Sequence, residues 1–254
     1  MYFFLVCLSF MEIIGISSVN CKLLSIIITA DHTISKSGCI AQSFFYYFFS
    51  SADFLILSVM SIDRFMAICY PLRYSSIMKP SLCINLVLSC FSISLLCLLY
   101  PTYMMSRVPF CGQVLDHFFC DSAAMLSLVC VDITLIKLST VINSVFILII
   151  PLIITSISYI FIVFTVIKMR STKSHHKTFS TCVSHLTMVF IVFGSAIFIE
   201  IRPSKSDSVE TDKAVNFVST ILGPLLNPFI YTLRNQKVKD CLRDKKIWKY
   251  CQYI

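Results

Sequence analysis

Two acidic side chains interrupt long apolar runs of this sequence, and a charged pair closes the second run. Glu12 and Asp53 stand among apolar residues, and Asp63 and Arg64 follow where the second run ends. Arg64 follows Asp53 by 11 residues, close to three helical turns, so both lie on one face of a helix. Two carboxyl groups that face each other away from water do not both stay ionised easily. The pattern predicts a shared-proton or cation site built from Glu12 and Asp53, with a single protonated acid as the alternative.

A second group of polar residues has the spacing H-x-x-C-D and consists of His117, Cys120 and Asp121. Imidazole and thiolate at this spacing suit Cu or Zn, and His117 would be the first ligand. A disulfide at Cys120 would remove the thiolate, and we favour that alternative. The sequence shows no nucleophile–base pair, glycine-rich phosphate loop or carboxylate pair outside the apolar runs, so we expect no enzyme and no cofactor beyond a bound cation.

The composition indicates that lipid surrounds most of the chain. Of its 254 residues, 57% are hydrophobic and 13% are charged, whereas globular domains carry about a quarter charged residues. Four windows, at 82–105, 138–167, 178–199 and 214–233, contain no Asp, Glu, Lys or Arg. Each is as long as the roughly 20 residues that a helix needs to cross a bilayer. The fold class expected is an all-α membrane protein.

Six membrane-spanning helices are predicted, followed by a short tail. The spans cover residues 2–28, 38–69, 82–105, 135–169, 178–201 and 214–233, so the helix bundle occupies residues 1–233. The tail, residues 234–254, alternates basic residues with Val238, Leu242 and Trp248. This pattern is typical of an amphipathic helix on a membrane surface, and a solvated charged tail is the alternative.

Lys and Arg concentrate in alternate loops, which orients the helices because these residues mark the cytoplasmic side. The basic residues of the predicted inner segments are Arg64, Arg73, Lys79, Lys168, Arg170, Lys173, Lys177, Arg234, Lys237, Lys239, Arg243, Lys245, Lys246 and Lys249. Most of the net charge of +8 therefore faces anionic lipid and cytosolic partners, and nothing indicates nucleic-acid binding. Cys39, Cys111, Cys120 and Cys130 fall on the outer side, where their spacing leaves three disulfide pairings open.

Five segments, taken in order, resemble the olfactory receptors, a branch of the rhodopsin-like G-protein-coupled receptors, and most closely the tetrapod type. They are MYFFLVCLSFMEI at the start of the chain, SIDRFMAICYPLRY at 61–74, HFFCDSAAMLSLVC at 117–130, KTFSTCVSHL at 177–186 and PLLNPFIYTLRN at 224–235. The resemblance begins at helix two of that family. We therefore expect six of the seven helices, two to seven, without the N-terminal tail and the first helix.

The resemblance implies a switch that engages a G protein. Its residues would be Asp63, Arg64, Tyr159, Asn227, Pro228 and Tyr231. Arg64 would be held by Asp63 at rest and released when helix six moves outward. A snorkelling arginine at the membrane edge is the alternative. Ile62 and Phe65 replace tyrosines that are usual beside this pair in the family, which removes two hydroxyl groups.

The resemblance also implies the remaining sites. The ligand would contact Tyr46, Tyr47, Ser50, Ser51, Asn143, Ile147, Phe193, Ala196, Glu200, Phe217 and Thr220. Phe193 replaces a tyrosine common in the family. A sodium ion would lie between Glu12 and Asp53, close to Asn227. By the same analogy, Cys39 pairs with Cys120 and Cys111 with Cys130.

The expected function is that of an odorant-type chemosensory receptor in the plasma membrane. By resemblance, it would bind small volatile molecules and activate a stimulatory G protein, which raises cyclic AMP. Two alternatives remain at this point. Glu12 and Asp53 resemble the intramembrane acids of proton-coupled transporters, although no internal repeat is visible. The chain could also be a truncated remnant that does not signal. The departures at Phe65, Phe193 and Phe91, which stands where a tryptophan is usual in helix four of the family, are consistent with that alternative.

Overall fold

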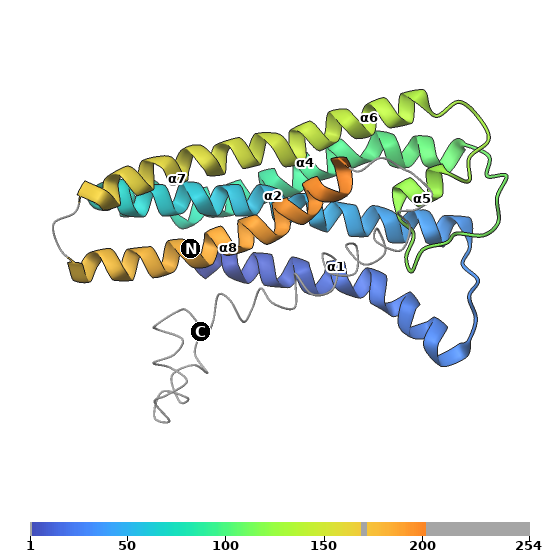
Figure 1. The fold of residues 1–254 in the computed structure, drawn as a ribbon, viewed down its shortest axis with the longest axis horizontal. Coiled ribbons are helices and arrows are strands. Elements are labelled where there is room, and N and C mark those ends of the chain that lie inside the picture. Colours follow the sequence, from blue (N-terminus) through green and yellow to red (C-terminus); the bar gives the residue numbers. More distant parts are fainter. Residues whose placement is uncertain (1, 169–171, 202–254) are drawn as a thin grey trace.

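The computed structural model describes residues 2–168 and 172–201 (Figure 1). Its helices are α1 Tyr2–Thr29, α2 Lys36–Cys69, α3 Pro71–Ile77, α4 Pro80–Arg107, α5 Ser122–Leu126, α6 Thr134–Ser144, α7 Ile150–Lys168 and α8 Thr172–Ile201, with a π-helical segment, η1, at Val145–Ile149. Apart from an isolated bridge between Phe110 and Val129, these ranges contain no strand pairing. The predicted span 214–233 and the tail 234–254 lie outside the described residues.

Helix α2 is the centre of the bundle. It packs against α1, α4, α7 and α8, and Figure 1 shows these long helices lying side by side. The main apolar core joins Phe4 and Leu8 of α1, Ile56 and Met60 of α2, and Phe193 of α8. Side chains on different faces of α2 therefore meet different neighbouring helices, which allows this one helix to contribute to several sites.

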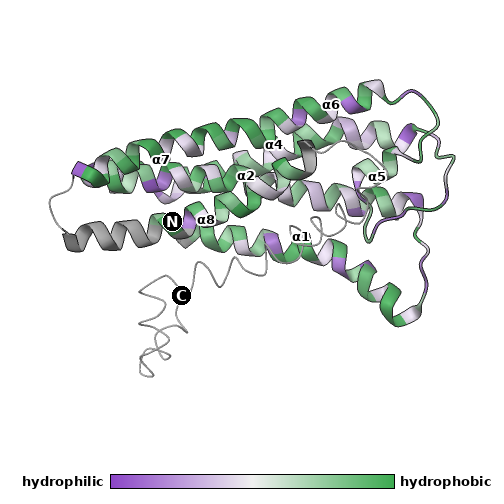
Figure 2. Ribbon diagram, in the orientation of Figure 1, coloured by the Kyte–Doolittle hydropathy of each residue, from purple (hydrophilic) through white to green (hydrophobic). Residues whose placement is uncertain are grey.

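The outward faces of the bundle are apolar, as Figure 2 shows along the long helices. Three of them, at Phe3–Thr29, Pro80–Arg107 and Thr134–Lys168, are long and apolar enough to cross a membrane by length and composition. Leu96 is 69% exposed and Phe164 is 61% exposed. Continuous apolar surface of this extent is unfavourable in water and favourable in lipid. The prediction of an all-α membrane protein is confirmed.

The segment predicted as one helix over 135–169 is interrupted. Pro151 has no N–H group, so the carbonyl of Ile147 loses the partner it would have in a regular helix. The chain widens into the π-helical segment η1, in which the N–H of Ile150 donates to the carbonyl of Val145. Such π segments reorient the side chains that follow them. The register of α7 relative to α6 therefore depends on this one proline.

Candidate functional site: a cytoplasmic switch and an outer lid

The cytoplasmic end of α2 carries a buried carboxylate that is held by a tyrosine. Asp63 is only 2% exposed, and the hydroxyl group of Tyr74 donates to its Oδ1 at 2.9 Å. Pro71 begins α3 and turns the chain back beneath α2, which brings Tyr74 to this position. Burial, together with the hydrogen bond to Asp63, raises the pKa of Tyr74 to about 12. Tyr74 therefore remains a neutral donor at physiological pH.

Arg64 of α2 faces α8. Its side chain is half-buried in α2, and its Nε has no hydrogen-bond partner among the described residues. The guanidinium interacts electrostatically with Cys182 and His185 of α8. His185 is 2% exposed, and its ring stacks on that of Tyr159 of α7, with 5.6 Å between the ring centroids. Arg64 and Tyr159 are thus brought into one cluster, whereas Asn227, Pro228 and Tyr231 lie outside the described residues.

The two intramembrane acids come from neighbouring helices. Glu12 of α1 is 6% exposed, and its charge interacts with that of Asp53 on α2. Glu12 Oε2 and Asp53 Oδ1 are buried and have no hydrogen-bond partner among the described residues. Buried polar atoms are rarely left without a partner, so these two oxygens fit a proton or a small hard cation.

Two disulfides shape the outer end. One joins Cys39, in the first turn of α2, to Cys120 of the long loop, and the other joins Cys111 to Cys130 within that loop. This is the pairing that the resemblance implies. The first bond ties the loop to the central helix, so the segment 117–126 covers the outer end of the bundle as a lid.

A hydrogen-bond network fixes the lid. Tyr47 donates to Asp121 Oδ1 at 2.7 Å, and Asp121 Oδ2 accepts from the backbone N–H groups of Ala123 and Ala124 at the start of α5. Gln42 accepts from the N–H of Cys120 at 3.1 Å. The metal hypothesis for His117, Cys120 and Asp121 does not fit this arrangement, because Cys120 is in a disulfide and both Asp121 oxygens are used. No group of three metal-ligating side chains occurs in the described part of the chain.

The residues expected to contact ligand fall into three sets. Tyr46 packs edge-on against Phe119 of the lid at 4.9 Å, and Tyr47 is engaged with Asp121, so both support the lid. Ser50 and Ser51 of α2, Ile147 of η1, Phe193 and Ala196 of α8 are half-buried or buried within the bundle. Phe193 packs on Phe54 at 5.0 Å. The side chain of Glu200 and residues Phe217 and Thr220 lie outside the described residues.

Asn143, which was also expected to contact the ligand, forms a hydrogen bond to a neighbouring helix instead. Its Nδ2 donates to the carbonyl of Cys97 in α4 at 2.5 Å. Pro101 lies four residues after Cys97, inside α4, and cannot supply the N–H that this carbonyl would bind in a regular helix. In lipid an unsatisfied carbonyl is costly, so Asn143 stabilises the contact between α4 and α6. Its donor is therefore engaged away from a central ligand pocket.

A family model described as olfactory receptor matches residues 1–249 of this chain. The chain belongs to the olfactory receptor family. Human olfactory receptor 6T1 is 46% identical over 249 residues, which cover 98% of this chain and 77% of that receptor. Human olfactory receptor 6S1 is 44% identical over 246 residues, covering 96% and 74%. Mouse olfactory receptor 6E1 is 39% identical over 256 residues, covering 99% and 82%. The family consists of chemosensory G-protein-coupled receptors, so this receptor is not an enzyme.

Three residues of the sites in this receptor were not predicted from its sequence. Tyr74 is 11 residues from Asp63, and the Pro71 that begins α3 was the available signal. His185 lies in the motif KTFSTCVSHL, but only packing shows that it meets Tyr159. Gln42 looks like an ordinary polar residue near a helix start, and only the folded structure reveals its partners on α1 and in the loop.

Replacing Tyr74 with Phe is expected to raise the basal activity of the receptor. The change removes the hydrogen bond to Asp63 and leaves the rings in place, and hydrogen bonds to charged groups contribute about 1.5–3 kcal/mol. This hydrogen bond stabilises the resting conformation at the C-terminal end of α2. We therefore expect basal nucleotide exchange on the G protein to rise about tenfold, normalised to the amount of receptor at the cell surface. Tyr70→Phe, which removes an exposed hydroxyl group in the same segment, is the control. Equal basal activity in both variants would contradict the role of Tyr74.

Proposed function

We propose that this olfactory receptor detects small, mainly apolar molecules and activates a stimulatory G protein, which raises cyclic AMP, at the plasma membrane. The observation that supports this function is the cluster at the cytoplasmic end. There the charge of Arg64 on α2 interacts with His185 of α8, which stacks on Tyr159 of α7, and Arg64 follows a carboxylate held by Tyr74. A charge in this position favours one arrangement of α2 and α8 and would be exposed if α8 moved. Asn227, Pro228 and Tyr231 would complete the switch from helix seven.

The chemistry of the proposed ligand is inferred from the residues that the resemblance implies would contact it. Ile147, Phe193 and Ala196 provide apolar surface, whereas Ser50 and Ser51 provide hydroxyl groups. An apolar cavity with a few hydrogen-bonding groups suits a small volatile molecule that carries one polar group. The lid, through Tyr46 and Phe119, would exclude water from above.

The test is a cyclic AMP reporter assay in cells that express the epitope-tagged chain, run against a panel of volatile compounds. We expect at least one compound to raise cyclic AMP, and we expect the response to vanish in cells that lack stimulatory α subunits and to return when the subunit is restored. A response carried by another class of G protein would contradict the stimulatory assignment. Uptake or current without any G protein would favour a transporter instead.

We further propose that Glu12 and Asp53 bind a sodium ion that favours the inactive state. Their buried oxygens without partners support this site, and the amide of Asn227 is the expected third ligand. The carboxylate pair supplies negative charge, and the cation would remove the repulsion between the two acids.

Sodium is therefore expected to lower the basal response and the agonist potency, because it binds the inactive state in preference. Replacing sodium with N-methylglucamine at constant ionic strength should raise both in the wild type. Asp53→Asn should lose this dependence, whereas Asp132→Asn, in the exposed outer loop, should keep it. A wild-type response that is unchanged across physiological sodium concentrations would exclude the cation site.

A further inference from the structure

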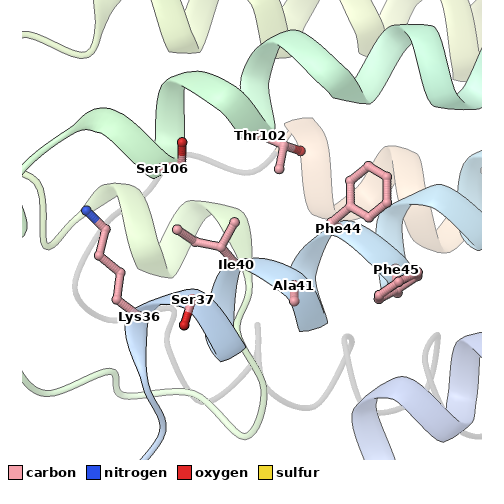
Figure 3. A pocket seen from close by; sticks show the side chains of 8 residues that line it. All are labelled: Lys36, Ser37, Ile40, Ala41, Phe44, Phe45, Thr102 and Ser106. Carbon is pink, nitrogen blue, oxygen red and sulfur yellow. The ribbon is translucent and has the colours of Figure 1, made fainter.

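A groove of about 660 Å³ lies between α2 and α4, near the outer end of the bundle (Figure 3). It is open on one side, and it does not belong to the switch, the acid pair or the lid network described above. From α2 it is lined by Lys36, Ser37, Ile40 and Phe44, and from α4 by Thr102 and Ser106. Phe45, which also lines the groove, is 49% exposed, so the open side presents apolar surface to the outside of the bundle.

The polarity of the groove changes along its length. Lys36, Ile40 and Phe44 follow one another at intervals of four residues, and Ser37 is next to Lys36, so they form one helical face over a little more than two turns. Lys36 and Ser37 lie at the outer end, Ile40 one turn deeper, and Phe44 another turn deeper. Helix α4 runs the opposite way, so Ser106 lies near Lys36 and Thr102 lies nearer Phe44, as Figure 3 shows. One end is therefore cationic and hydroxyl-bearing, and the other is aromatic.

Two contacts fix the position of the Lys36 ammonium group. Lys36 Nζ donates to the carbonyl of Val108 at 2.7 Å and lies 4.6 Å from the centre of the Phe110 ring. An ammonium group has three N–H donors, and the carbonyl of Val108 takes one of them. The described residues contribute no carboxylate to the groove lining, so the positive charge at its mouth is complementary to an anion.

We propose that this groove binds one glycerophospholipid from the outer leaflet. The phosphate lies at Lys36 with the hydroxyl groups of Ser37 and Ser106, and one acyl chain runs along Ile40 and Phe44. Thr102 lies deeper, near Phe44, on the α4 side of the acyl chain. A sterol carries a single hydroxyl group and no anion, so it would leave the charge of Lys36 unpaired. The order of charge, hydroxyl groups and apolar surface matches the order of groups in a phospholipid.

The test uses the intact receptor in lipid nanodiscs that contain phosphatidylcholine with a photoactivatable group on its acyl chain. After illumination, mass spectrometry of the digested receptor should find the label on residues 40–45 and 102–106. Lys36→Gln should reduce this labelling about fivefold, because one lysine–phosphate contact is lost, whereas Lys36→Arg should retain it. Lys22→Gln is the matched control and should leave labelling unchanged, because Lys22 is a half-buried lysine toward the outer end of α1 that donates to the carbonyl of Asp31 and does not line the groove.

A second variant keeps the proposal testable if Lys36→Gln does not fold. Ala41→Trp fills the groove from its lining while leaving Lys36 in place, and it should also abolish the labelling. Label that spreads evenly over the lipid-facing helices would overturn the proposal. So would labelling that excess cholesterol displaces, or labelling that both Lys36→Gln and Ala41→Trp leave intact in folded receptor. None of these readouts depends on an odorant or a G protein, so the result is separate from that of the proposed signalling function.

Discussion

Arg64→Ala is expected to abolish the ligand-evoked cyclic AMP response and to leave the amount of receptor at the cell surface unchanged. Arg64 is half-buried, and its charge interacts with His185 and Cys182 of α8. Alanine removes the group that would reach the G protein after α8 moves, and each charge-assisted hydrogen bond lost there costs about 1.5–3 kcal/mol. That corresponds to about a 10- to 150-fold weaker complex for a single bond.

Two measurements distinguish this effect from a folding defect. Surface labelling of the epitope tag reports the amount of receptor, and the cyclic AMP reporter gives the response per receptor. Arg107→Ala removes a positive charge at the outer end of α4, where Arg107 lies 5.3 Å from the centre of the Tyr103 ring, and it should respond normally. A normal response in Arg64→Ala would remove Arg64 from the mechanism.

Breaking the bond between Cys39 and Cys120 is expected to have the second large effect. The bond closes a loop with a sequence separation of 81 residues, whereas the bond between Cys111 and Cys130 closes one of 19. Limiting the unfolded chain in this way contributes about 2–4 kcal/mol per disulfide, and more for the longer loop. The variant with both Cys39→Ser and Cys120→Ser should therefore lose most of its surface expression and its ligand response.

The corresponding double variant at Cys111 and Cys130 is the matched comparison, since it removes the same number of sulfur atoms. It should retain more surface receptor, because its loop is shorter and the tie between the lid and α2 remains. Mass spectrometry of the unreduced wild type should recover a peptide pair that contains Cys39 and Cys120. Recovery of Cys39 joined to Cys111, or as a free thiol, would contradict this connectivity.

The helices were predictable from sequence because each membrane span can be recognised from the hydropathy of its own residues. The span predicted at 2–28 is α1, Tyr2–Thr29, and the span at 82–105 is α4, Pro80–Arg107. The π-helical segment before Pro151 was not predicted, because the proline indicates that a carbonyl loses its partner but not whether the helix kinks or widens in response. Helix α8 also begins earlier than the predicted 178, at Thr172.

The sites were less predictable, because they are assembled by contacts between helices. Glu12 and Asp53 were paired from their isolation in apolar runs, and the structure places them within electrostatic reach. Asn143 was expected to face a ligand, but its donor binds the Cys97 carbonyl, a need that arises only where Pro101 and α6 meet. Tyr47 likewise bonds to Asp121, which lies 74 residues away in the sequence. Periodicity along one helix does not report such partners.

Few residue types can replace Gln42. Its amide oxygen accepts from the N–H of Cys120, while its amide nitrogen donates to the carbonyl of Ser18 at 3.1 Å, so one residue connects α1, α2 and the lid. Among side chains of this length, an amide alone both donates and accepts without a charge, since glutamate lacks the donor, lysine lacks the acceptor and methionine lacks both. In a saturation mutagenesis screen for surface display, position 42 should therefore tolerate almost no substitution, whereas the exposed apolar position Ile62 of the same helix should accept other apolar residues.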